Sequence, residues 1–305
     1  MPLEPIGSMM KRAREGRYAV GYFESWNLES LQGVVDAAEE ARSPVILGFN
    51  GDFLSRPRST PERLELYAQL GLAAAESTTV PCGLIFNECP RDDWVVNAVD
   101  LGFNLVMLAD PAAEADAIEA RVAAIVRHAH RSRVAVEGEV GELPMDAGLA
   151  DSASHRGERT DPAAAEAFVA ATGVDLLAVS VGNVHIQLGQ PGGLDLDLIE
   201  QLERRLQIPL VLHGGTGISR EALAEAIARG VTKVNFGTYI KQHYLNIVRQ
   251  TLSRVVADPH QVLGLGGPDD SLVAGRRAVR DAVLERIDWL GSRNQAPGML
   301  EEKGS

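Results

Sequence analysis

Short apolar runs alternate along the chain with longer segments in which hydrophobic residues recur at helical spacing. Eight of these apolar runs have the length of strands, and they are Ala19–Ser25, Pro44–Phe49, Cys82–Asn87, Leu105–Ala109, Val134–Val140, Leu176–Val181, Leu210–His213 and Lys233–Gly237. The amphipathic segments between them include Leu28–Ala41, Pro61–Ser77, Ala113–His130, Asp161–Thr172, Leu196–Leu206 and Arg220–Arg229. Continuous apolar strands that alternate with helices indicate a parallel sheet covered by helices.

Eight strand–helix units favour closure of this sheet into a barrel. The predicted fold class is therefore α/β, a single-domain (β/α)8 TIM barrel. We expect residues 1–294 to form the barrel with its C-terminal helices, and residues 295–305 to form a disordered tail. An open doubly-wound sheet is the alternative, but the sequence lacks the Gly-x-Gly-x-x-Gly turn that its dinucleotide-binding form carries after the first strand.

The composition is that of an acidic globular protein, with a formal net charge of −13 over 305 residues. An acidic chain without a Lys/Arg cluster is a poor candidate for binding nucleic acid or an anionic membrane. The 2 cysteines cannot form a disulfide framework and fit a reducing compartment. We find neither the apolar stretch of a secretion signal nor a window apolar enough to span a bilayer, and we expect a cytoplasmic protein.

Polar side chains gather where several predicted strands end, which is where barrels of this type carry their active sites. The third strand ends in Asn87 and Glu88, and the fifth carries Glu139. His185 follows the sixth strand, and His213 ends the seventh. Two imidazoles with carboxylates from neighbouring strands form a ligand set that divalent metals accept. The sequence therefore predicts a metal site made of His185, His213, Glu88 and Glu139.

Each of these side chains also has a purely structural interpretation. Glu88 can lie at the surface and pair with Arg91, a contact of little energetic value. Glu137 and Glu139 are two residues apart, so they share one face of the strand and can form salt bridges without any metal. A single histidine at a strand end is often only a hydrogen-bonded rim residue, and it is the pair of histidines that favours a metal.

A glycine-rich turn, Gly214–Gly217, follows the seventh strand and leads into a predicted helix. Such a turn presents backbone amides that suit an anion, especially phosphate, although glycine is also needed for tight turns as such. Barrels often bind phosphate at the loops after strands seven and eight. We predict that the substrate and its phosphate bind at Gly214, Gly215, Thr216, Asn235 and Thr238.

Along nearly its whole length the chain resembles the class II, metal-dependent fructose-bisphosphate and tagatose-bisphosphate aldolases. The residues that carry the resemblance are Tyr18–Phe23, Val136–Gly141, Leu210–Gly217 and Lys233–Thr238. It implies a lyase of carbohydrate metabolism that cleaves a ketose (bis)phosphate or related sugar reversibly, through a metal-stabilised enediolate. The implied cofactor is a divalent metal, zinc first, with manganese, magnesium or cobalt as alternatives. The implied partners are a sugar phosphate substrate and further copies of the chain in a homodimer or homotetramer.

The resemblance carries metal ligands onto His185 and His213 and the metal-proximal glutamate onto Glu139. It carries contacts to the bound triose phosphate onto Gly214, Thr216, Asn235 and Thr238. The third strand departs from the family pattern His-x-Asp-His, which supplies a proton-transferring aspartate and a third metal histidine. The matching positions hold Asn87, which cannot exchange a proton near neutral pH, and Glu88, which can still ligate a cation.

The catalytic candidates are thus Glu88, Asn87 and Glu139, with a glutamate replacing aspartate as the acid and base. Two other functions remain open. One is a catalytically silent paralogue that binds a sugar phosphate or a protein partner, since loss of both strand-three residues is what decay of catalysis would leave. The other is a different enediolate reaction, such as epimerisation, in which a cation would serve the same purpose.

Overall fold

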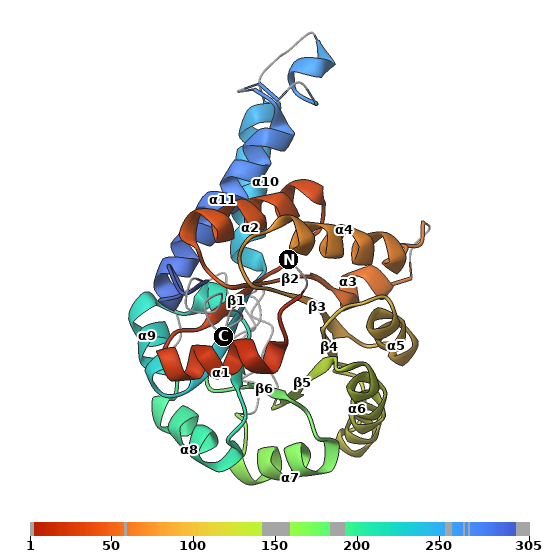
Figure 1. Cartoon of the computed structure of the whole chain (residues 1–305), viewed down its shortest axis with the longest axis vertical. Coiled ribbons are helices and arrows are strands. Elements are labelled where there is room, and N and C mark those ends of the chain that lie inside the picture. Colours follow the sequence, from red (N-terminus) through yellow and green to blue (C-terminus); the bar gives the residue numbers. More distant parts are fainter. Residues whose placement is uncertain are drawn as a thin grey trace, which may run out of the picture.

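The computed structural model describes residues 3–57, 60–141, 159–183, 193–253, 258–264, 266–267 and 269–296. Its strands form a closed parallel barrel in chain order, in which β1 pairs with both β2 and β8 (Figure 1). The strands are β1 (Val20–Phe23), β2 (Val45–Asn50), β3 (Cys82–Cys89), β4 (Leu105–Leu108), β5 (Ala135–Val140), β6 (Leu176–Val179), β7 (Leu210–Leu212) and β8 (Val231–Phe236). The predicted TIM-barrel fold is confirmed.

Helices surround the barrel, as Figure 1 shows. Those that the sequence pattern predicted between the strands are α2 (Leu28–Ala41), α4 (Leu64–Ser77), α6 (Ala115–Ala129), α7 (Pro162–Thr172), α8 (Leu196–Leu206) and α9 (Arg220–Ala228). Beyond β8, α10 (Thr238–Leu252) and α11 (Ser271–Leu290) pack against each other, and α11 also packs on α2. The pattern did not predict α1 (Ile6–Gly16), α3 (Gly51–Ser55) or α5 (Asp92–Asp100).

Helix α1 lies across one end of the barrel in Figure 1. Its buried residues Ile6, Met9, Met10 and Ala13 have the spacing of a single helix face. They belong to the same buried cluster as residues of the strands, including Val20, Ile46 and Ile85. The Glu4 amide, just before the helix, donates to the Cys82 carbonyl at the start of β3 at 2.8 Å. Because α1 covers the N-terminal end of the strands, the C-terminal end is left for a site.

The inner surface of the barrel changes from apolar to polar toward the C-terminal ends of the strands. On β8 the residues Lys233 and Asn235 are buried, and on β5 so is Glu137. Lys233 and Asn235 are two residues apart, so they lie on the same face of β8. A buried polar layer of this kind must satisfy its hydrogen bonds internally or through a ligand.

The chain after α11 runs back along the end of α2. The Asn294 amide donates to the Ala41 carbonyl and the Ala296 amide donates to the Arg42 carbonyl, both at 2.9 Å, at the C-terminal end of α2. Residues 297–305 of the predicted tail lie outside the described residues. None of the helices in the described part of the chain has the length and apolar character that a membrane span requires.

Candidate active site

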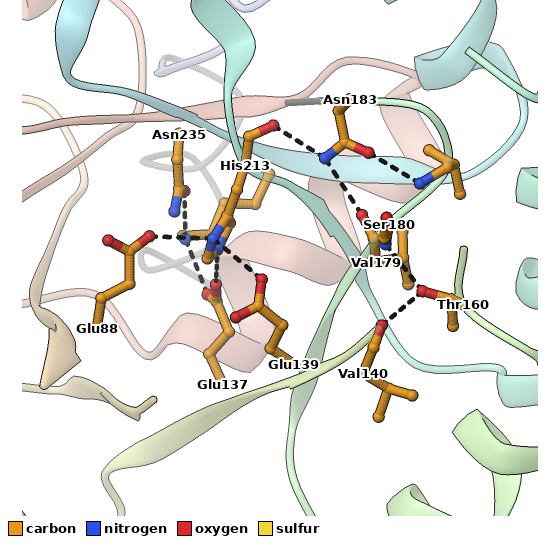
Figure 2. A network of polar contacts seen from close by, with 12 residues as sticks. Glu88, Glu137, Glu139, Val140, Thr160, Val179, Ser180, Asn183, His213 and Asn235 are labelled. Carbon is orange, nitrogen blue, oxygen red and sulfur yellow. Dashed lines mark hydrogen bonds and ion pairs between the residues drawn. The ribbon is translucent and has the colours of Figure 1, made fainter. Parts of the chain in front are cut away.

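His213 lies at the centre of the polar layer, just after β7, and is 1% exposed. Its Nε2 lies 2.8 Å from Glu137 Oε1, and its Nδ1 lies 3.0 Å from Glu88 Oε1 and 3.7 Å from Glu139 Oε1. Asn183 holds the backbone of the histidine by donating its Nδ2 to the His213 carbonyl at 3.0 Å. Three carboxylates, from β3 and β5, therefore surround one imidazole (Figure 2).

Glu137 links His213 to a second buried cation. Lys233 Nζ lies 2.8 Å from Glu137 Oε2 and donates to Asn235 Oδ1 at 2.6 Å, and both Glu137 and Lys233 are 0% exposed. Burial opposes the charge of Glu137, but Lys233 and His213 outweigh it and hold the pKa of Glu137 below its usual value. The ionised Glu137 accepts the Nε2 proton and so fixes which ring nitrogen faces the other carboxylates.

The charge of His213 follows from these contacts. Burial alone lowers the pKa of an imidazole, but hydrogen bonds to Glu137 and Glu88 raise the pKa of His213 to about 10. The histidine is therefore protonated at neutral pH when no metal is bound. A divalent cation bound at Nδ1 would take the place of that proton, because metal ligands must be deprotonated.

The donor types around His213 Nδ1 suit a divalent cation. Glu88 and Glu139 contribute carboxylate oxygens beside an imidazole nitrogen, a combination that zinc, manganese and cobalt all accept. In the part of the chain that the structure describes, no three His, Cys, Asp or Glu side chains are arranged as a metal-holding group, and the separations given above are those of ion pairs. The predicted ligand His185 lies outside the described residues. The carboxylates of Glu88 and Glu139 and the imidazole of His213 therefore match a metal site in the chemistry of their donor atoms, while their spacing is that of ion pairs.

Glu88 reaches His213 through an unusual backbone conformation. Strand alternation makes Asn87, which is 2% exposed, the inward residue of β3, and would turn the next residue outward. Glu88 instead has a left-handed φ of 52°, and the pairing of β3 with β4 shifts register between Phe86 and Cys89. For a residue other than glycine this conformation costs about 1–2 kcal/mol, so the surrounding contacts must hold it in place.

The contacts of Glu88 are not those of a surface residue. Asn50 donates its Nδ2 to Glu88 Oε2 at 2.8 Å, while Glu88 Oε1 faces His213. Arg91, the surface partner considered from the sequence, pairs with Asp93 on α5 instead. The side chain of Glu88 is 14% exposed, so it belongs to the polar layer.

Among the described residues near the site, several buried polar atoms make no hydrogen bond, and three of them belong to neutral side chains that could face a ligand. They are Asn87 Oδ1, Tyr22 Oη and Asn235 Nδ2, and the last two residues are register partners on β1 and β8. Burial, together with the charges of Glu24 and Glu88, raises the pKa of Tyr22 well above its usual value, so its hydroxyl remains a donor. An unsatisfied buried polar atom costs about 1–3 kcal/mol, and a bound ligand would relieve that cost.

The glycine-rich turn has the conformation that its composition predicts. Gly214 is left-handed, with φ 67°, and Gly215–Gly217 form one turn of 3-10 helix (η3). The next helix, α9, is capped by Ser219, whose side chain accepts from the Ala222 amide at 3.2 Å. The first amides of α9 are thus partly satisfied by the chain itself.

The start of α10 lies beside this turn, because Thr216 Oγ1 accepts the Tyr239 amide at 3.1 Å. The residue before α10, Gly237, provides no side-chain cap. A Cβ at Gly237 would lie 2.3 Å from Glu24 Oε2, so glycine is required for the close approach of this carboxylate. Glu24 in turn forms an ion pair with Lys241 on α10. The η3 turn and the first turn of α10 thus lie side by side after β7 and β8.

Sequence reasoning missed three residues that support this layer, namely Asn50, Lys233 and Glu24. Lys233 could have been found, because it lies two residues before Asn235 and so shares its strand face. Asn50 and Glu24 both stand at or just beyond the C-terminal end of a strand, where barrels carry functional side chains.

Comparison with known proteins assigns the chain to a family. The sequence model described as Fructose-bisphosphate aldolase class-II matches residues 4–295. The chain belongs to the class II fructose-bisphosphate aldolase family. The fructose-bisphosphate aldolase of Geobacillus stearothermophilus is 31% identical over 303 residues, which cover 97% of this chain and 99% of that protein. The fructose-bisphosphate aldolase of Streptococcus pyogenes serotype M1 is 32% identical over 300 residues, which cover 97% of this chain and 100% of that protein.

A solved structure agrees with these relatives. The crystal structure of the YdjI aldolase from Escherichia coli K12 matches with a TM-score of 0.81 and 28% identity, covering 97% of this chain and 100% of that one. The resemblance inferred from the sequence motifs is therefore confirmed. Membership of the class II aldolase family makes the chain a carbon–carbon lyase of the aldolase type.

Proposed function

We propose that this class II aldolase is metal-dependent and cleaves a ketose phosphate reversibly into a triose phosphate and an aldehyde. The observation that carries the proposal is the convergence of Glu88 and Glu139 on His213 Nδ1, with Glu137 holding the other ring nitrogen. An imidazole oriented by a buried carboxylate is the arrangement that metal-ligating histidines adopt in proteins.

The residues that would hold the cation are His213, Glu88 and His185, with Glu139 beside them. When bound, the cation would supply positive charge that polarises the substrate ketone. Zinc is the first candidate, and manganese, magnesium and cobalt are alternatives because carboxylate ligands suit harder cations. Lys233 keeps Glu137 ionised, so Glu137 in turn keeps Nδ1 directed at the site.

We assign proton transfer to Glu139. Asn87 cannot exchange protons near neutral pH, and Glu88 is engaged by both Asn50 and His213. The side chain of Glu139 is 25% exposed, against 14% for Glu88 and 0% for Glu137, so it has the best access to substrate and solvent. Geometry within reach of the reacting group is the first requirement for a general acid or base.

The substrate would be held by the remaining polar groups of the layer. The donors Tyr22 Oη and Asn235 Nδ2 and the acceptor Asn87 Oδ1 suit the hydroxyl and carbonyl groups of a sugar. Its phosphate would bind between the η3 turn and the start of α10, at Gly214, Gly215, Thr216 and Thr238. Asn87 thus keeps a role as a binding residue although it has lost that of an acid.

We further propose that the chain acts in the cytoplasm as a homodimer or homotetramer. Large apolar side chains on α10 support association, because Leu245 is 45% exposed and Leu252 is 54% exposed. In Figure 1 this helix and α11 extend away from the barrel, where a second copy could cover them.

A cleavage assay tests the proposed reaction. The purified chain is incubated with a panel of ketose mono- and bisphosphates, and release of triose phosphate is followed with a coupled dehydrogenase. We expect release that is lost after treatment with a chelator and restored by at least one of zinc, manganese, magnesium or cobalt. An absence of release with every substrate and cation would contradict the proposal and favour the catalytically silent paralogue.

A further inference from the structure

Asn50 lies where β2 meets α3, and both ends of its side-chain amide are engaged. Its Oδ1 accepts the Phe53 amide at 3.0 Å and so caps α3. Its Nδ2 donates to Glu88 Oε2 at 2.8 Å. Because an acceptor and a donor are both required, these two contacts fix the orientation of the amide.

Glu88 uses its two carboxylate oxygens for different contacts. Oε2 accepts from Asn50, while Oε1 faces His213 Nδ1 at 3.0 Å. The bond from Asn50 therefore decides which oxygen is directed at the place where a cation would bind. It also limits rotation about the last side-chain bond of Glu88.

The backbone of Glu88 makes this support necessary. Asn50 pairs in register with Asn87, so it stands on the neighbouring strand next to Glu88. Glu88 is left-handed, a conformation that persists only where the surroundings hold it. The hydrogen bond from Asn50 connects the strained residue to a helix cap that is itself fixed by the fold.

We propose that Asn50 is a positioning residue for the metal ligand Glu88. It holds Oε2 so that Oε1 is presented to the cation, and it supports the left-handed turn that brings the carboxylate inward. Hydrogen-bond partners of ligating carboxylates contribute about 10–100-fold to metal affinity in proteins. This inference rests on the proposed function, because it presupposes that Glu88 ligates a cation.

The test measures cation affinity in the full-length chain without substrate. Affinity for zinc and for cobalt is determined by competition with a chromophoric chelator for the wild type and for Asn50→Ser. Serine still caps α3, since it is a preferred N-cap residue, but it is too short to reach Glu88. We expect Asn50→Ser to bind the cation about 10–100-fold more weakly while its circular dichroism spectrum stays unchanged.

Two further variants make the result specific. Asp52→Asn on the same helix breaks an exposed pair with Arg56, and we expect it to leave affinity within about twofold. In a Glu88→Ala background, Asn50→Ser is expected to change the remaining affinity by less than about twofold, because Asn50 acts through Glu88.

Each outcome separates this inference from the proposed function. If the wild type binds the cation and Asn50→Ser binds it equally well, the positioning role is wrong and the metal site stands. If Asn50→Ser lowers the cation affinity equally in the wild type and in the Glu88→Ala background, the positioning role is also overturned, because Asn50 would then act by another route. If the wild type binds no cation, the proposed metal dependence fails and this inference fails with it.

Discussion

His213 Nε2 and Glu137 Oε1 lie 2.8 Å apart, and both side chains are closed to solvent. Glu137 also meets Lys233 Nζ at 2.8 Å, so one buried carboxylate balances two buried cations. A buried ion pair of this kind contributes little over an apolar replacement, but removing one partner leaves an uncompensated charge.

We therefore expect Glu137→Gln to lower the free energy of unfolding by about 3–5 kcal/mol, because Lys233 would be left buried without a counter-ion. Urea unfolding followed by circular dichroism measures this change. The matched control is Glu200→Gln, which breaks an exposed pair with Arg204 on α8 and should change the free energy by less than about 0.5 kcal/mol. A loss below about 1 kcal/mol for Glu137→Gln would show that the Lys233 charge is compensated elsewhere.

Tyr22→Phe is expected to stabilise the fold while weakening the enzyme. The hydroxyl of Tyr22 is buried and has no partner among the described residues, so its removal relieves an unsatisfied group and should raise the free energy of unfolding by up to about 1 kcal/mol. Loss of one donor to the substrate should raise KM by about tenfold.

The control for this pair of measurements is Tyr244→Phe. The hydroxyl of Tyr244 accepts from Asn27 Nδ2 at 3.0 Å. Removing this hydroxyl should therefore lower the free energy of unfolding by about 0.5–1.5 kcal/mol. Equal destabilisation by Tyr22→Phe and Tyr244→Phe would show that the Tyr22 hydroxyl has a partner within the protein rather than in the substrate.

The left-handed backbone at Glu88 can be isolated by comparing two variants that both remove the carboxylate. We expect Glu88→Gly to be more stable than Glu88→Ala by about 1 kcal/mol, because only glycine adopts this conformation without strain. Thermal unfolding of the two variants measures the difference. If alanine is the more stable of the two, Glu88 does not hold this conformation in solution.

The buried thiol of Cys82 predicts a pH effect away from the site. Burial raises the pKa of Cys82 to about 11, from about 9 in the unfolded chain. As the pH rises, the Cys82 thiol therefore loses its proton in the unfolded state before it does so in the folded state. Its contribution to the free energy of unfolding is full below pH 9 and falls by about 1.4 kcal/mol per pH unit above it. The difference in unfolding free energy between the wild type and Cys82→Ala should shrink accordingly from pH 8 to pH 10. Parallel pH profiles would contradict the shift.

The barrel could be predicted because its evidence is periodic. Eight apolar runs with helical segments between them admit few topologies, and α2 and α8 were predicted with the bounds observed. Helices α3 and α1 escaped prediction for different reasons. α3 has five residues, too few to show a periodic pattern, and α1 buries its apolar face against the end of the barrel, a contact that only the closed fold creates.

The site was predictable in its residue types and less so in its contacts. The shared strand face of Glu137 and Glu139 follows from their spacing, and both do meet His213. The inward turn of Glu88 does not follow from alternation, which would point it outward, and depends on a local φ of 52°. The support from Asn50 depends on a residue of the neighbouring strand and could not be predicted from Asn50 alone. Lys233 was within reach of prediction, because it shares a strand face with Asn235.

The measurement that bears most directly on the metal-dependent assignment is the metal content of the purified chain. After incubation with zinc, manganese, magnesium or cobalt and removal of excess ions, elemental analysis should find about one divalent cation per chain in the wild type. His213→Ala and His185→Ala should each reduce this to a small fraction, because they remove the nitrogen donors. A wild type that retains no cation, or both histidine variants retaining a full complement, would contradict the assignment.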